Sequence, residues 1–139
     1  MFTQQDIQRI QATVFGLVDC PWQGEVTVSC GAGLTVQVED GRADIQAESL
    51  AALARGFFRM AQELDEDKEA FSFHEEKQFD TCGAFLDFSR NGVMTPKKVK
   101  EFASLIAGMG YNMLQLYTED TYEMDGEPYF GYMRGRYTK

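Results

Sequence analysis

The sequence predicts an α+β protein, in which a small antiparallel sheet covered by two helices precedes a parallel β-α-β unit. Apolar residues alternate over three short segments between positions 25 and 47, which is typical of half-buried strands. The segments on either side have the three- and four-residue spacing of amphipathic helices. A strand, a helix and a second strand then follow between Gly83 and Asp120. A helical crossover between two strands makes those strands parallel.

The first predicted block, residues 1–79, contains the sheet and its two helices. Thr3 is a candidate cap for the first helix, and the second helix is expected over 48–64. Asp40-Gly41 favours a tight hairpin because both residues tolerate positive φ, and 31–33 favours a looser hairpin. A fourth strand is expected over 70–74. The apolar positions that define the expected faces are Ile7, Ile10, Val14, Leu17, Val26, Val28, Cys30, Leu34, Val36, Val38, Ala43, Ile45, Ala47, Leu50, Leu53, Phe57, Met60, Ala61 and Leu64.

The second predicted block, residues 80–139, contains the parallel unit. Its strands are expected over 83–88 and 112–117. Thr95-Pro96 predicts the start of the connecting helix, because a hydroxyl cap precedes a proline that needs no amide partner, and Gly110 predicts its end. The face of this helix toward the sheet is expected to hold Val99, Phe102, Ile106 and Met109. An aromatic, glycine-rich loop follows over 122–137.

Polar residues gather where both parallel strands end. Ligands bind at the carboxyl ends of the strands in parallel α/β sheets and barrels, so these residues are candidates for a binding site. Strand alternation puts Asp87 and Tyr117 on the side away from the helix. A structural Asp–Arg pair is as good an interpretation of the first two positions as a ligand site, and core packing explains the tyrosine equally well. The candidates are Asp87, Arg90, Tyr117, Glu119 and Asp120.

Composition narrows the classes of function. Thirteen basic and twenty-two acidic residues give a net charge of −9, which disfavours nucleic acid and anionic membranes as partners. Three widely spaced cysteines and a single histidine predict no metal site. We expect the cysteines to be buried, reduced thiols. The first residues have no signal-peptide pattern, and no apolar stretch has the length of a membrane helix, so we expect a cytoplasmic protein.

The residues of the second block resemble a known family. Segments 83–91, 95–96 and 112–119, the last with the sequence Asn-Met-Leu-Gln-Leu-Tyr-Thr-Glu, look like the opening of the catalytic barrel of glycoside hydrolase family 20. More narrowly, they are similar to bacterial β-N-acetylhexosaminidases. Residues 1–79 are similar in size and order to the non-catalytic α+β domain before that barrel. The resemblance implies a (β/α)8 barrel that removes terminal N-acetylhexosamine with retention, the substrate's acetamido oxygen acting as nucleophile, with no cofactor.

The resemblance also implies roles for particular residues. Arg90 matches the arginine that binds ring hydroxyls of the terminal sugar, and we expect Asp87, Tyr117 and Glu119 to support it. The family's catalytic Asp–Glu pair follows the fourth barrel strand. Glu119-Asp120 has the reverse order and follows the second strand, so we expect no catalytic residue in this chain.

The expected protein is therefore the N-terminal part of a glycosidase, inactive alone. A non-catalytic interaction or assembly module, and a different barrel enzyme with a similar first unit, are the alternatives. Two parallel strands and one helix cannot bury both faces of a sheet. We accordingly expect the second block either to dock on the first or to pair with a second copy, which would form a homodimer.

Overall fold

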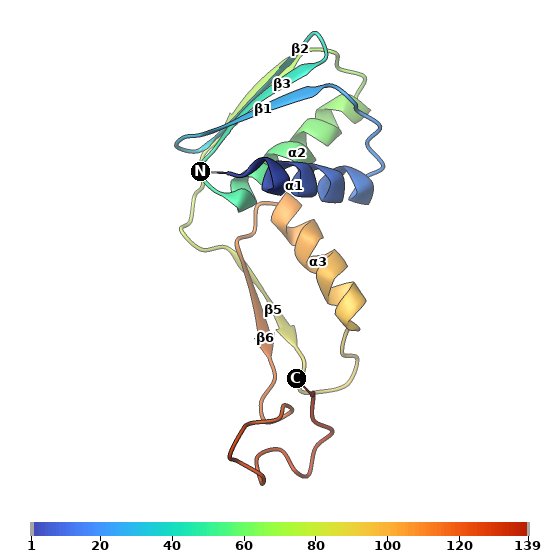
Figure 1. Ribbon diagram of the computed structural model, residues 1–139, viewed down its shortest axis with the longest axis vertical. Helices are drawn as coiled ribbons and strands as arrows, with labels where there is room; N and C mark the ends of the chain where they lie inside the picture. Colours follow the sequence, from blue (N-terminus) through green and yellow to red (C-terminus); the bar gives the residue numbers. More distant parts are fainter. Residues whose placement is uncertain (1, 139) are drawn as a thin grey trace.

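The computed structural model describes residues 2–138, so Met1 and Lys139, the outer limits of the two predicted blocks, lie outside it. The molecule is elongated, with a sheet at one end, helices in the middle and a second, smaller sheet toward the other end (Figure 1). The elements are α1 (Gln4–Leu17), β1 (Glu25–Cys30), β2 (Leu34–Glu39), β3 (Arg42–Ala47), α2 (Leu50–Asp65), β4 (Phe71–Glu75), β5 (Gly83–Asp87), α3 (Pro96–Gly108) and β6 (Met113–Tyr117).

The first sheet is mixed, and the prediction of an all-antiparallel sheet is wrong. Its strand order is β1-β3-β2-β4, with β1 parallel to β3 and the other pairs antiparallel. The predicted hairpin at Asp40-Gly41 is confirmed, but the one at 31–33 is wrong, since that connection passes the end of β3. Hydrogen bonds from Gly31 N to Ala47 O (3.2 Å) and from Glu48 N to Gly33 O (3.0 Å) hold it there. Alternation of apolar residues fixes the face of a strand but not its neighbours.

Helices α1 and α2 lie together against one face of this sheet (Figure 1). Thr3 caps α1, as predicted, by accepting a hydrogen bond from Asp6 N (3.1 Å), and Ser49 caps α2 by accepting one from Ala52 N (3.1 Å). None of the helices in residues 2–138 has the length and apolar character needed to cross a bilayer. The buried apolar core of this block consists of Ile7, Val14, Phe15, Leu34, Val36, Val38, Ala43, Ile45, Ala47, Leu53, Ala54, Phe57, Met60 and Ala61.

Some predicted burials are wrong at the edges of the block. Phe15 is buried on α1 in contact with the rings of Trp22 and Phe57, whereas Leu17 at the end of the helix is exposed. All three cysteines are free, but Cys30 is exposed and the other two are half-buried. Cys30 is the last residue of an edge strand, and edge strands have a sheet neighbour on one side only.

The second block is the predicted parallel β-α-β unit. Strand β5 pairs in parallel with β6, from Gly83 opposite Met113 to Asp87 opposite Tyr117. Asn112 fixes the start of both strands, because its side chain accepts a hydrogen bond from Cys82 N (2.9 Å) and donates one to Asp80 O (2.8 Å).

Helix α3 docks the parallel unit on the first block. It packs on both α1 and α2. Gly108 touches the Phe58 ring of α2 so closely that an added Cβ would lie 2.8 Å from it. Ile106 is buried, while Val99 and Phe102 are half-buried. Met109, expected on the covered face, is exposed because it lies at the C-cap of the helix.

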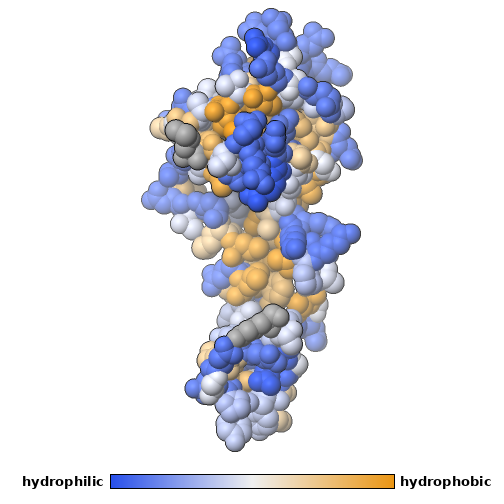
Figure 2. All heavy atoms as spheres, viewed as in Figure 1, coloured by the Kyte–Doolittle hydropathy of each residue, from blue (hydrophilic) through white to orange (hydrophobic). Residues whose placement is uncertain are grey.

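The β5–β6 sheet keeps apolar side chains exposed. Phe85 is 58% exposed, and Met113 and Leu116 are each 43% exposed. Apolar residues gather over the middle of the molecule, at the level of α3, β5 and β6, between hydrophilic ends (Figure 2). A two-stranded parallel sheet normally has both faces covered, so these residues mark surface that is available for further packing.

Two leucines of α2 are expected to differ sharply in their contributions to the free energy of unfolding. Leu53 is fully buried and Leu50, one turn earlier, is 43% exposed. Leu53→Ala should lower the free energy of unfolding by about 2–5 kcal/mol, because it leaves a cavity in the core. Leu50→Ala, the matched control, should lower it by about 1 kcal/mol or less. Urea denaturation followed by circular dichroism measures both, and equal losses would contradict the described packing of α2.

Candidate functional site

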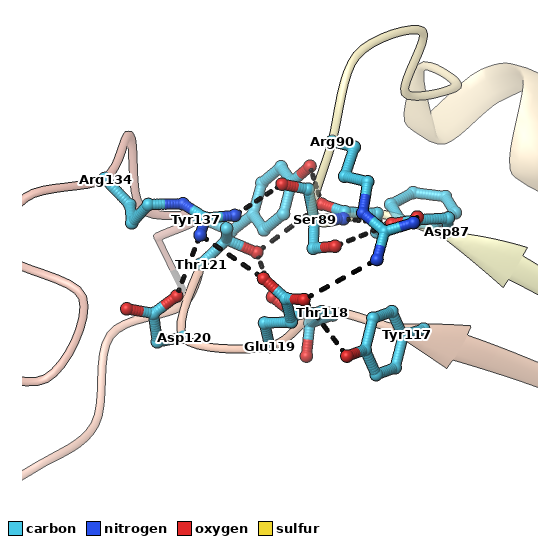
Figure 3. A network of polar contacts seen from close by, with 11 residues as sticks. Asp87, Ser89, Arg90, Tyr117, Thr118, Glu119, Asp120, Thr121, Arg134 and Tyr137 are labelled. Atoms are coloured by element: carbon cyan, nitrogen blue, oxygen red, sulfur yellow. Dashed lines mark hydrogen bonds and ion pairs between the residues drawn. The ribbon is translucent and has the colours of Figure 1, made fainter.

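The parallel register brings the carboxyl ends of β5 and β6 together. Asp87 lies opposite Tyr117, and the next amide, Phe88 N, donates a 2.7 Å hydrogen bond to Tyr117 O. Both strands point into one group of polar side chains (Figure 3). We call this group the rim cluster, and its members are Asp87, Ser89, Arg90, Tyr117, Glu119, Asp120 and Arg134.

Asp87 organises the end of β5. Its Oδ1 accepts hydrogen bonds from Ser89 N (2.8 Å) and Ser89 Oγ (2.7 Å), which closes a tight turn directly after the strand. These two bonds, followed by the nearby charge of Arg90, lower the pKa of the Asp87 carboxyl below its ordinary value. Oδ2 remains to pair with Arg90 Nη1 at 3.3 Å. The Asp–Arg pair, one of the two interpretations that the sequence left open, is therefore present.

Arg90 itself is held loosely. Its side chain is 71% exposed, its ion pair with Asp87 involves one guanidinium nitrogen, and Glu119 Oε1 lies 4.0 Å from Nη2. A guanidinium carries five N–H donors in a fixed fork. Most of the Arg90 donors therefore face solvent at the mouth of the rim cluster, where a ligand can reach them.

Glu119 has a backbone conformation that is uncommon for its residue type. Its φ is +48°, in the left-handed region, which a glutamate adopts at some cost in energy. The turn aims its carboxylate back over the end of β6, where Oε1 accepts a 3.0 Å hydrogen bond from Tyr117 Oη. That hydrogen bond and the carboxylate charge raise the pKa of the Tyr117 phenol. Strained backbone of this kind gathers at functional sites.

Tyr117 does not pack in a core within residues 2–138. It is 37% exposed, and its ring stacks on Phe85 of the neighbouring strand with centroids 5.6 Å apart. This stacked pair lies on the face of the sheet that also carries Asp87, since Phe85 and Asp87 are two positions apart on β5 and Asp87 lies opposite Tyr117.

The sequence reasoning missed Arg134, which reaches the rim cluster from the loop after β6. Its Nη1 pairs with Glu119 Oε2 (3.3 Å) and Asp120 Oδ1 (3.5 Å), and its Nη2 donates a 2.5 Å hydrogen bond to Ser89 O. The loop turns back at Gly131, which has a φ of +65°. A Cβ at this position would lie 1.9 Å from the Asp120 carbonyl oxygen, so the tight turn depends on the absence of a side chain there.

Further hydrogen bonds connect the same loop to the end of β5 and to the turn after β6. Tyr137 Oη donates a 2.7 Å hydrogen bond to Phe88 O, and Tyr137 N donates one to Thr121 O at 2.7 Å. Thr121 is buried, and its hydroxyl donates to Thr118 O (2.5 Å). Nothing in the spacing of Tyr137 or Arg134 relative to the strands marked them in advance, since their partners lie at least 14 positions away.

The chemistry of the rim cluster suits binding better than proton transfer or nucleophilic attack. It offers guanidinium donors, carboxylate acceptors and aromatic rings, which is the set that recognises a polyhydroxylated ligand. Across residues 2–138, no three His, Cys, Asp or Glu side chains are arranged to hold a metal ion. A groove between the two blocks is lined by other charged side chains, but these pair with one another: Arg55 with Glu75 (2.9 Å) and Lys77 with Glu48 (3.4 Å).

The turn after β5 gives a prediction about acid titration. Ser89→Ala should raise the pKa of Asp87, because the hydroxyl that stabilises the ionised carboxylate is lost. The ionised Asp87 stabilises the fold above its unfolded-state pKa, and this contribution disappears as the pH falls through the lower folded-state pKa. Ser89→Ala should narrow that pH interval. Carbon-13 NMR titration of the Asp87 carboxyl measures the change.

A matched control is Ser104→Ala on α3, whose hydroxyl donates to Lys100 O and touches no carboxylate. An Asp87 pKa that is the same in Ser89→Ala and in the parent would contradict the described turn.

Comparison with known proteins adds no family assignment. The chain matches no protein-family model, and no curated protein matches it at a significant level. Its function is accordingly inferred from the geometry of the rim cluster and from the residues themselves.

Proposed function

We propose that this chain is the N-terminal part of a β-N-acetylhexosaminidase, a glycosidase that removes terminal N-acetylhexosamine from glycans. In this proposal residues up to 79 form a non-catalytic α+β domain, and β5, α3 and β6 form the first unit of a (β/α)8 catalytic barrel. The observation that carries the proposal is the exposed guanidinium of Arg90 at the carboxyl end of a parallel strand, the edge at which barrels bind their substrates.

The surroundings of Arg90 support a sugar as ligand. Adjacent hydroxyls of a pyranose ring match the spacing of guanidinium donors, and the less polar face of the ring can stack on an aromatic side chain. Arg90 supplies the donors, and the stacked rings of Phe85 and Tyr117 lie on the same side of the sheet. Asp87 pairs with the guanidinium at 3.3 Å and Glu119 lies 4.0 Å from it, and the resemblance to glycoside hydrolase family 20 implies support roles for both.

The exposed apolar residues of the β5–β6 sheet support a barrel that continues. In a (β/α)8 barrel the first strand pairs with the second and the eighth, and the second strand also pairs with the third. The remaining strands and helices of the barrel would cover Met113 and Leu116, which are each 43% exposed in residues 2–138. The additional strands would also use the free edges of β5 and β6.

Catalysis in the proposed enzyme requires an acid that the rim cluster does not supply. Glu119 and Asp120 are both paired with Arg134, at 3.3 and 3.5 Å. In the family that the sequence resembles, the catalytic pair follows the fourth barrel strand and assists attack by the substrate's own acetamido oxygen. We therefore expect residues 1–139 alone not to hydrolyse glycosides. The three free thiols favour a reducing compartment, which is the cytoplasm in our proposal.

Hydrolysis of p-nitrophenyl N-acetyl-β-glucosaminide tests the proposed function. A form of the protein extended by at least two further strand-helix units should release nitrophenol, and the 139-residue chain should not. In the extended form, Arg90→Ala should lower kcat/KM by roughly 10- to 150-fold, since hydrogen bonds to a charged donor contribute about 1.5–3 kcal/mol.

Arg9→Ala is the matched control for Arg90→Ala. Arg9 is also 71% exposed and pairs with an aspartate three residues away, Asp6, at 3.2 Å, but it lies on α1 far along the chain from the rim cluster. Its replacement should leave kcat/KM unchanged. Equal effects of the two substitutions would remove Arg90 from the sugar site, and activity of the 139-residue chain would refute the proposed location of the acid.

A second candidate function, a non-catalytic assembly module that forms homodimers, is favoured by one observation. The exposed apolar face and free edges of β5–β6 are the kind of surface through which two copies pair. In this case light scattering of the 139-residue chain should give a dimer mass at high concentration. Phe85→Glu should dissociate the dimer, whereas Phe79→Glu, at a 72% exposed position outside the small sheet, should not. A monomer at all concentrations would exclude this candidate.

A further inference from the structure

The rim cluster has an excess of negative charge around its exposed arginine. Three carboxylates, Asp87, Glu119 and Asp120, share two guanidiniums, Arg90 and Arg134. Arg134 takes two of the three carboxylates at 3.3 and 3.5 Å. Arg90 keeps one partner at 3.3 Å and has Glu119 at 4.0 Å, near the limit of an ion pair. Arg134 therefore pairs with more of these carboxylates than Arg90 does.

Glu119 lies between the two guanidiniums, and this is visible in Figure 3. Its Oε2 faces Arg134 Nη1, and its Oε1 accepts from Tyr117 Oη on the side toward Arg90. Because Arg134 is also anchored on Ser89 O at 2.5 Å, its position does not depend on Glu119 alone. Arg134 is thus a fixed cation that competes with Arg90 for a carboxylate within reach of both.

We propose that Arg134 is a positioning residue that retains Glu119 and so keeps the guanidinium of Arg90 available to a ligand. Without Arg134, the carboxylate of Glu119 would have Arg90 as its nearest cation and would close the 4.0 Å separation. Arg90 would then form ion pairs with both Asp87 and Glu119, and its N–H donors would point at protein oxygens. The idea that the guanidinium donors of Arg90 bind a sugar rests on the proposed function. The competition between Arg90 and Arg134 for Glu119 does not depend on that function.

Chemical reactivity of Arg90 reports its availability directly. Phenylglyoxal modifies exposed guanidiniums, and digestion followed by mass spectrometry gives a rate for each arginine in the 139-residue chain. Arg9 is an internal reference in the same sample, because its exposure and its pairing with an aspartate match those of Arg90. Arg134→Met should slow modification of Arg90 by roughly two- to fivefold, the range of a surface ion pair, and leave Arg9 unchanged.

Three further variants separate competition from simple anchoring of the loop. Adding Glu119→Gln to Arg134→Met should restore the rate at Arg90, because the carboxylate that captures it is gone. Arg136→Met removes a guanidinium from the same loop that bonds only to Phe130 O (3.3 Å) within the described contacts, and it should not slow Arg90. Arg134→Lys, which keeps a cation at the position, should retain most of the parent rate.

The outcomes distinguish this inference from the proposed function. An unchanged Arg90 rate in Arg134→Met, a failure of Glu119→Gln to restore it, or an equal loss in Arg136→Met would each show that Arg134 only anchors the loop, and would overturn the inference. No sugar is present in these measurements. If the extended form fails to hydrolyse the nitrophenyl glycoside, the proposed function falls while the reactivity pattern of Arg90 stands.

Discussion

Main-chain pairing between β5 and β6 brings together the two strand ends from which the rim cluster is built. Because the strands are parallel and in register, Asp87 meets Tyr117 at the same edge of the sheet. A slip of one residue would turn Tyr117 to the opposite face and separate its phenol from the side on which Asp87 lies. Asn112 fixes the register at the amino end of both strands, and the Phe88 N–H to Tyr117 O hydrogen bond fixes it at the carboxyl end.

The first block holds this small sheet in place without contributing to its chemistry. Two strands cannot form a core of their own, so the unit depends on α3, which packs against α1 and α2 through Ala107 and Gly108. The rim cluster lies at the end of the strands away from that contact (Figure 1). The main core therefore lies at one end of the molecule and the polar rim cluster at the other, and the exposed apolar residues of the small sheet lie between them.

The sequence predicted those features that depend on local pattern. Helix caps and the Asp40-Gly41 turn follow from residues a few positions apart, the parallel crossover follows from the strand-helix-strand order, and all are present. The parallel pairing of β1 with β3 was missed because alternation says nothing about which strand is the neighbour. Arg134 was missed for a related reason: its Ser89 partner is 45 residues away, and only the turn at Gly131 brings the two together.

The direction of the β5–β6 pairing is the central claim, and hydrogen-bond scalar couplings measure it most directly. A long-range HNCO experiment on the labelled chain should detect a coupling between the Phe88 amide nitrogen and the Tyr117 carbonyl carbon, across the 2.7 Å hydrogen bond. Nuclear Overhauser contacts should also join Gly83 to Met113 at the other end. Contacts of Gly83 with Tyr117 and of Asp87 with Met113 would mean antiparallel strands, and the rim cluster would not exist.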